Sequence, residues 1–152
     1  GEVGELAVRN PGREREYFGD PEATARTWRD GWLHTGDLAW VDADGYLYIV
    51  GRMKDVIIRG GNNVHAADVE AVLYEHPDVQ EAAVAGVAHP VLGEDVGAWV
   101  VAVAGASPDE VALAAFCAER LSPEKVPRTW RFLDALPRNP TGKVVKADLP
   151  GR

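Results

Sequence analysis

The sequence has 152 residues, of which 46% are hydrophobic and 26% are charged, and its formal net charge is −8. These values are typical of a soluble globular chain of one domain, or of a small domain with part of another, and the negative charge argues against general nucleic-acid binding. No apolar run is long enough to form a transmembrane segment. The start lacks a signal peptide's basic residues and apolar stretch, and it opens without methionine on a predicted strand. We therefore expect a piece cut from a larger protein.

The first third of the chain predicts β-structure. Residues 4–10 are predicted to form a strand, which leads into a polar segment at residues 11–31. Residues 37–52 contain two apolar runs on either side of Asp44-Gly45, and this pattern favours a β-hairpin.

The remainder of the chain predicts helices that alternate with strands. Residues 66–77 carry apolar side chains at helical spacing up to Pro77, and residues 107–121 begin with Ser107 as an expected N-cap. The predicted strands are a pair at residues 55–64 around Gly60-Gly61, then residues 79–87, 96–105 and 129–136.

This order of elements predicts an α+β fold. We expect a small C-terminal α/β domain with a three-stranded antiparallel sheet, flanked by helices and a β-hairpin, and preceded by strands from the end of a larger domain. The expected boundary follows the hairpin, so that residues 1–51 belong to the larger domain and residues 52–152 form the C-terminal domain.

The single cysteine, Cys117, excludes an internal disulfide and fits a reducing, cytoplasmic compartment. It lies among apolar residues, which favours a buried thiol over a nucleophile. Charge is unevenly distributed, because the chain from Arg120 onward holds eight Lys/Arg against three Asp/Glu. This basic segment could meet an anion or could simply be a solvated face.

Three polar clusters are candidates for chemistry. In the first, at residues 34–37, Asp37 follows a glycine and could accept two hydrogen bonds from a sugar diol, or could merely shape a turn. In the second, Arg52 and Lys54 could bind anions, and Gly60-Gly61 could admit a ligand close to the backbone. Taken alone, the second cluster is better explained as a surface hairpin with a glycine turn and two solvated cations. None of the clusters predicts a metal site.

The third cluster is the loop "LPRNPTGKVV", which carries Lys143. It is not a nucleotide P-loop, because Pro137 stands at the first glycine position and Val144 replaces the hydroxyl that would bind magnesium. Lys143 therefore needs another explanation.

Taken in order, the three clusters resemble the adenylate-forming superfamily of acyl-CoA synthetases, luciferases and peptide-synthetase adenylation domains. "GYLYIVGRMKDVIIRGGNNV" is similar to the family's signature, and "DGWLHTGDLA" and "LPRNPTGKVVKADL" are similar to its two flanking motifs. "GELAVRN", "PEAT" and "HPVLGED" are weaker matches. The resemblance covers essentially the whole chain. Within the signature, Arg52 and Lys54 followed by "DVIIRGGNNV" are more similar to acyl-CoA synthetases than to peptide-synthetase domains.

The resemblance implies a role for each candidate residue. Asp37 would hold the ribose hydroxyls of the nucleotide, with Arg52 nearby, and Lys54 would be the hinge about which the C-terminal domain turns. Gly60 and Gly61 would border the tunnel for the pantetheine of coenzyme A. Lys143 would be catalytic, touching the substrate carboxylate and the oxygens at the α-phosphate.

The implied reaction has two steps. A carboxylic acid attacks ATP to give an acyl-adenylate, and coenzyme A then takes the acyl group. ATP, Mg²⁺, coenzyme A and the acid are thus the expected ligands. The family's phosphate loop and its magnesium-binding glutamate belong to a large N-terminal domain that this sequence does not contain, so that domain is the expected partner. Two alternatives stay open: an adenylation domain that loads a carrier protein, and a non-catalytic module that binds a partner.

Overall fold

A computed structural model describes residues 1–9 and 15–152, so the end of the strand predicted at residues 4–10 and the start of the polar segment at residues 11–31 fall outside it. The chain divides into two compact units, Gly1–Lys54 and Asp55–Arg152. We describe each unit by itself. The division lies close to the boundary expected after residue 51, and the assignment of the first unit to a larger domain stays a prediction.

The first unit is a four-stranded antiparallel sheet built around one long central strand. The central strand is β3 (Trp32–Val41), and it pairs with β1 (Gly4–Val8), β2 (Trp28–Arg29) and β4 (Leu47–Arg52). The expected hairpin at residues 37–52 is confirmed by the pairing of β3 with β4. Its turn is closed by Asp42, whose Oδ1 accepts hydrogen bonds from the amides of Asp44 and Tyr46 at 3.0 and 2.8 Å.

The helix α1 (Pro21–Thr27) was not expected within the polar segment. Its start is nevertheless signalled by the sequence: Asp20 is the N-cap, its side chain accepts a hydrogen bond from the amide of Ala23 at 2.8 Å, and Pro21 occupies the first helical position. The helix has no buried residue and no apolar stripe, so hydrophobic periodicity could not indicate it.

The second unit contains a five-stranded sheet. The hairpin of β5 (Val56–Arg59) and β6 (Asn62–His65) joins β8 (Gly93–Ala102), which pairs along its length with β7 (Val79–His89). The strand β9 (Thr129–Phe132) also pairs with β8. Short 3₁₀ turns are formed by η1 (Met53–Asp55), at the division between the units, and by η2 (Lys146–Asp148), near the C-terminus.

The predicted α+β fold is confirmed, with two differences in the sheet. The β5–β6 hairpin joins the three expected strands, so the sheet has five strands. β9 runs parallel to β8, whereas an antiparallel arrangement was expected. The helix α3 (Glu110–Ala118) lies in the connection between the two strands and returns the chain to the same end of the sheet, which makes them parallel. The N-cap of α3 also differs from the expected Ser107. It is Asp109, whose Oδ1 accepts a hydrogen bond from the amide of Ala112 at 2.7 Å.

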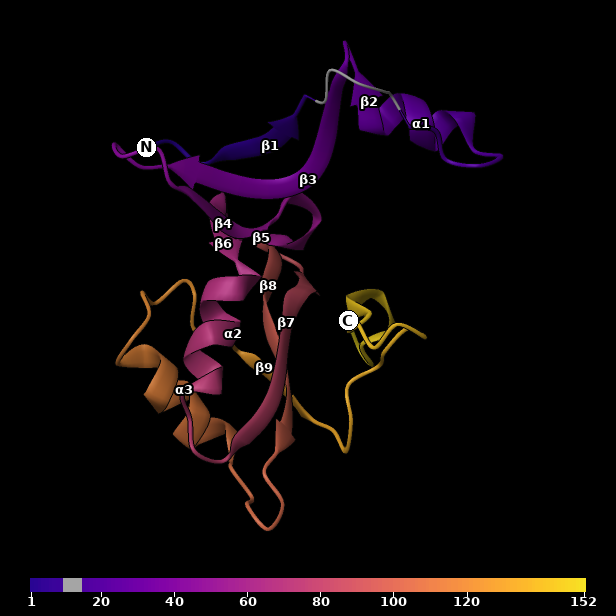
Figure 1. The fold of residues 1–152 in the computed structure, drawn as a ribbon. Helices are drawn as coiled ribbons and strands as arrows, with labels where there is room; N and C mark the ends of the chain where they lie inside the picture. The colour runs from indigo at the N-terminus through magenta and orange to yellow at the C-terminus, as the bar shows by residue number, and fades with distance from the viewer. Residues whose placement is uncertain (10–14) are drawn as a thin grey trace. The chain divides into compact units, whose positions relative to one another are not determined.

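Both faces of the β7–β8 hairpin are covered (Figure 1). Helix α2 (Ala66–Tyr74) and α3 lie on one side, and the C-terminal segment, residues 133–150, lies on the other. Alternate residues of each strand serve two separate cores. The helix-side core takes Ala82, Val84, Val96, Ala98 and Val100, and the second core takes Ala83, Ala85, Trp99 and Val101 together with Leu136 and Leu149 of the C-terminal segment. This burial on both faces explains the continuous apolar run of β8.

Cys117 is fully buried in the helix-side core, as expected. Burial removes the thiolate from water and raises the pKa of its thiol to about 11, against the opposing effect of Arg120. The thiol therefore stays protonated at neutral pH and acts as a small apolar side chain.

Candidate functional site

The first candidate cluster lies where β3 is irregular. Gly36 has a positive φ of 71°, and the pairing of β3 with β1 shifts register around it. The pairing with β4 shifts register two residues later, between Leu38 and Ala39. Thr35 stabilises this irregularity, because its Oγ1 donates to the carbonyl of Leu6 at 2.8 Å and accepts from the amide of Asp37 at 3.1 Å. Thr35 binds the backbone of Asp37 and not its carboxylate, so the carboxylate can bind other groups.

Asp37 and Arg52 form an ion pair across β3 and β4. They are register partners in the hairpin, and Arg52 Nε donates to Asp37 Oδ1 at 2.9 Å. The Asp37 side chain is 24% exposed and the Arg52 side chain 54% exposed. A half-buried carboxylate oriented by one guanidinium nitrogen can accept hydrogen bonds from a diol through its remaining lone pairs.

Glu5 is a polar residue of this cluster that sequence reasoning missed. Its carboxylate contacts His34 Nδ1 at 2.8 Å, the amide of Gly36 at 3.3 Å and Arg29 at 3.4 Å. The hydrogen bond with His34 is the largest influence on the pKa of Glu5 and lowers it, and the Gly36 amide and Arg29 act in the same direction against desolvation. A glutamate inside the otherwise apolar "GELAV" was the available signal.

Lys54 lies at the division between the two compact units. It is the central residue of η1, it is exposed, and within residues 1–9 and 15–152 it forms no ion pair. A residue at such a position can change the relation of two units through its backbone torsions alone.

Gly60 and Gly61 form the two-residue turn between β5 and β6, with positive φ values of 56° and 88°. Two consecutive positive φ values define a type I′ turn, which residues with a Cβ adopt only with strain. The turn is also held from outside, since the amide of Gly60 donates to the carbonyl of Leu92 at 3.0 Å. The backbone of this turn is therefore both exposed and fixed.

Two further contacts hold the β5–β6 hairpin against β8. Glu94 Oε2 accepts from the amide of Ile58 at 2.8 Å, and Arg59 Nε donates to Asp95 Oδ1 at 2.6 Å. Asp95 is the one buried charged residue in the described part of the chain. Desolvation, the largest influence on its pKa, raises it, but the amide of Val96, Arg59 and the charge of Arg128 together bring the pKa below its usual value.

Lys143 is exposed on a small hairpin loop that is closed by internal hydrogen bonds. Arg138 and Val144 form an isolated antiparallel bridge at its base. Inside it, Asn139 Oδ1 accepts hydrogen bonds from the amides of Thr141 and Lys143 at 3.1 and 2.9 Å. Among the described residues no acidic side chain pairs with the Lys143 ammonium. The backbone is fixed while the charge is left available.

Comparison with known proteins identifies the family of the chain. The family model of the AMP-binding enzyme C-terminal domain matches residues 68–143, which end on Lys143. The chain is 49% identical over 148 residues to 2-succinylbenzoate–CoA ligase of Geobacillus kaustophilus, covering 97% of this chain and 30% of that enzyme. It is 45% identical over 152 residues to a fatty acid–[acyl-carrier-protein] ligase of Streptomyces coeruleorubidus, covering all of this chain and 29% of that enzyme.

A solved structure agrees with these relatives. The o-succinylbenzoate CoA synthetase of Bacillus subtilis, in complex with its acyl-adenylate intermediate, superposes with a TM-score of 0.90 at 38% identity, covering 98% of this chain and 30% of that one. The chain thus spans about a third of the length of the relatives that it matches. The described residues contain no helix long and apolar enough to cross a membrane, and no group of three or more His, Cys, Asp or Glu that could hold a metal ion. The resemblance seen in the sequence is confirmed: the chain belongs to the family of AMP-binding enzyme C-terminal domains.

Proposed function

We propose that the chain is the C-terminal part of a cytoplasmic acid–CoA ligase, comprising the last strands of its large N-terminal domain, residues 1–51, and its mobile C-terminal domain, residues 52–152. The whole enzyme activates a carboxylic acid with ATP and Mg²⁺ as an acyl-adenylate and then passes the acyl group to coenzyme A. The observation that carries this proposal is Lys143, an exposed ammonium on a rigid loop at the end of the family match.

In the first step, a carboxylate oxygen of the acid attacks the α-phosphorus of ATP, and pyrophosphate leaves. Negative charge gathers on the oxygens around phosphorus, and the Lys143 ammonium, a compact charge on a long stem, stabilises it. Asp37 accepts hydrogen bonds from the ribose hydroxyls, while Arg52 orients its carboxylate. We assign no magnesium ligand to the described residues; the metal-binding glutamate is proposed to lie in the large domain.

In the second step, the thiolate of coenzyme A attacks the acyl carbon, and AMP leaves with the electron pair of the broken acyl–oxygen bond. The backbone torsions of Lys54 allow the C-terminal domain to turn between the steps. Gly60 and Gly61 then border the pantetheine, because a turn without side chains lets a narrow thiol arm pass close to the backbone.

The test is a panel of acids given to the full-length protein with ATP and Mg²⁺. Suitable probes are 2-succinylbenzoate, ferulate and palmitate, with pyrophosphate release as the readout of the first step and acyl-CoA formation as that of the second. We expect acid-dependent pyrophosphate release and a thioester product with at least one acid. Pyrophosphate release that no acid increases would refute the proposal and favour a non-catalytic module that binds a partner.

A second candidate is an enzyme that loads a carrier protein. It is favoured by the relative from Streptomyces coeruleorubidus, which is a fatty acid–[acyl-carrier-protein] ligase and which aligns with all 152 residues of this chain. Supplying a phosphopantetheinylated carrier protein in place of coenzyme A distinguishes the two. Acyl transfer to the carrier with none to coenzyme A would assign the chain to this class.

A further inference from the structure

The outer edge of β7 is covered by two side chains of opposite charge. β7 pairs with β8 alone among the described strands, so its other edge presents unpaired backbone groups. At Val84 both groups are satisfied: the amide donates to Glu70 Oε1 at 2.8 Å, and the carbonyl accepts from Lys146 Nζ at 2.9 Å. Glu70 Oε1 and Lys146 Nζ also form an ion pair at 2.7 Å.

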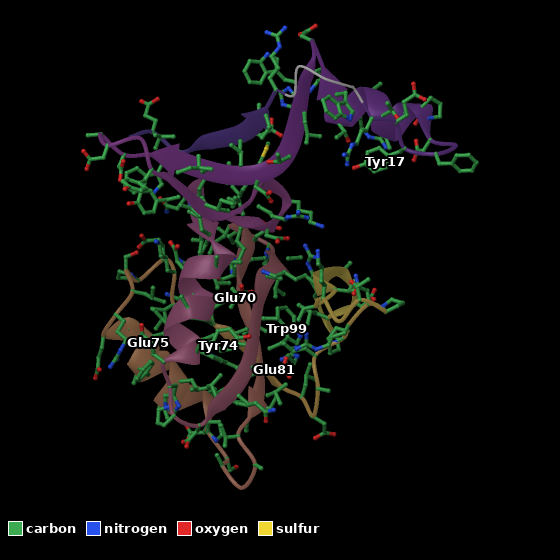
Figure 2. The ribbon with its side chains drawn as sticks, viewed as in Figure 1. Tyr17, Glu70, Tyr74, Glu75, Glu81 and Trp99 are labelled. Carbon is green, nitrogen blue, oxygen red and sulfur yellow. The ribbon has the colours of Figure 1, made fainter. Side chains whose placement is uncertain are left out.

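The two partners reach this edge from opposite faces of the sheet. Glu70 belongs to α2, on the side of the helix-side core, and Figure 2 shows it where that helix passes β7. Lys146 begins η2 in the C-terminal segment, which covers the second core. Their side chains are only 21% and 19% exposed. The contact therefore fastens the C-terminal segment to the domain at one defined point of β7.

Lys146 lies three residues after Lys143. Before Lys143, the loop is attached through Arg138, which contacts Glu81 of β7 and also donates to the carbonyl of Gly142 at 2.6 Å. After Lys146, Leu149 is buried in the second core, and the carbonyl of Pro150 accepts from Trp99 Nε1 at 2.9 Å. Figure 2 shows Trp99 and Glu81 on the hairpin that this segment covers.

The Glu70–Lys146 pair is the charged contact that follows Lys143 in this anchored segment, as the Arg138–Glu81 pair is the one that precedes it. The loop is stiff inside, so its position depends on how it is fastened at its base. A hydrogen-bonded ion pair that also binds both backbone groups of Val84 fixes distance and direction together, whereas the apolar contact of Leu149 with the second core is not directional.

We propose that Glu70 and Lys146 are positioning residues for the adenylation step, acting through Lys143. They touch neither substrate nor nucleotide. They attach the segment that follows the Lys143 loop to the backbone of Val84 in β7. The inference rests on the proposed function and deepens it. Because Lys143 acts only in the first step, loss of the pair should slow acyl-adenylate formation and spare acyl transfer.

The test uses Lys146→Met and Glu70→Gln in the full-length enzyme, with the acid of the panel that gives the highest rate. Methionine keeps the length of the lysine side chain without its charge. We expect kcat for pyrophosphate release to fall about 10-fold to ~10²-fold, the loss that a misplacement of about an ångström brings. Thioester formation from supplied acyl-adenylate should change less than about 2-fold, a difference of a few tenths of a kcal/mol. Lys146→Arg, which retains a donor and a charge, should recover much of the first step.

The matched control is Lys125→Met. Lys125 pairs with Asp68 Oδ2 at 2.6 Å, so this change also removes a lysine ion pair with α2, but it lies away from the C-terminal segment. We expect it to leave both half-reactions as in the wild type. Equal damage by Lys125→Met and Lys146→Met would show general loosening of the domain and overturn the proposal.

A Lys143→Ala background separates this proposal from the proposed function. If Lys146 acts through Lys143, Lys146→Met should cost little more in that background, since the pair then positions nothing. If Lys143→Ala slows adenylation while Lys146→Met does not, the positioning role is refuted and the proposed function stands. If Lys143→Ala itself leaves adenylation unchanged, the assignment of Lys143 fails, and the positioning role fails with it.

Discussion

The Lys143 ammonium stands out from a loop whose backbone is bound by Asn139 and Arg138. Its charge can therefore be removed without loss of the loop. In the full-length enzyme, Lys143→Ala is expected to lower the rate of pyrophosphate release by ~10²-fold or more, the effect of deleting one preorganised donor at a developing negative charge. Acyl transfer from supplied acyl-adenylate should be largely retained. Equal loss in both half-reactions, measured separately, would show that Lys143 has a different role.

Asp37 should matter in both half-reactions, because the nucleotide stays bound throughout the proposed reaction. Asp37→Ala removes the proposed acceptor of the ribose hydroxyls, and an unpaired polar group costs about 1–3 kcal/mol. We therefore expect the KM for ATP to rise about 10-fold or more. Asp42→Ala, in the hairpin turn of the same sheet, is the control. If Asp37→Ala binds ATP like the wild type, Asp37 only shapes the irregularity of β3.

Asp95 gives the second unit an acid-sensitive contact. Its pKa is lowered in the folded state, so its contribution to stability is present above its usual pKa of 3.8 and is lost as pH falls through the folded value. Asp95→Asn leaves Arg59 without its carboxylate and should cost about 2 kcal/mol at pH 7. Thermal unfolding at pH 7, 4 and 3 measures this difference in stability. The wild type should be more stable than Asp95→Asn at pH 7, and the difference should decrease below pH 3.8. A constant difference at all three pH values would assign the effect to packing.

At the scale of elements, the 3₁₀ turn η1 is where a hinge can be tested. Residues in 3₁₀ turns have φ values of about −50 to −70°, which proline also adopts. The Lys54→Pro variant should therefore fold, with the φ of residue 54 fixed. We expect the variant to complete one half-reaction and fail in the other, while Lys54→Ala changes both by less than ~3-fold, within the range of ordinary surface substitutions. If alanine is as damaging as proline in separate half-reaction assays, Lys54 is a ligand and not a hinge.

Most elements followed from local patterns. Asp44-Gly45 and Gly60-Gly61 mark the two tight hairpins, and the apolar spacing before Pro77 marks α2. The parallel direction of β9 could not be read locally, because it depends on the course of the chain through α3. The same holds within the site. Lys143, Asp37 and Arg52 belong to recognisable motifs, whereas Glu70 meets Lys146 only through folding, and neither residue carries a local signal of the other.

At the scale of the whole molecule, the two units differ in how much they bury. Ala39 is the one buried residue of the first unit within the part that the structure describes, and Trp32, Tyr48 and Ile49 of its sheet are 41%, 44% and 62% exposed. The second unit has two cores of its own. This contrast supports the proposal that residues 1–51 complete a larger domain, because a sheet of this size needs an apolar partner to be stable.

The chain Gly1–Arg152 by itself is accordingly expected to be inactive. It lacks the proposed phosphate loop and acyl pocket, while its second unit should still fold around its own cores. The purified chain should show a cooperative thermal transition and no acid-dependent pyrophosphate release. Activity of the isolated chain with any acid of the panel would contradict the assignment of those sites to the large domain.

The cover over the second core has a consequence for biosynthesis. The ribosome makes β7 and β8 before residues 133–150, so nascent chains present Ala83, Ala85 and Trp99 to the surroundings until their partner segment has left the exit tunnel. Exposed apolar strands of this kind attract chaperones and promote aggregation. The segment that carries Lys143 thus also covers the second core, and a premature stop before Leu136 is expected to remove the proposed catalytic lysine and to leave Trp99 uncovered.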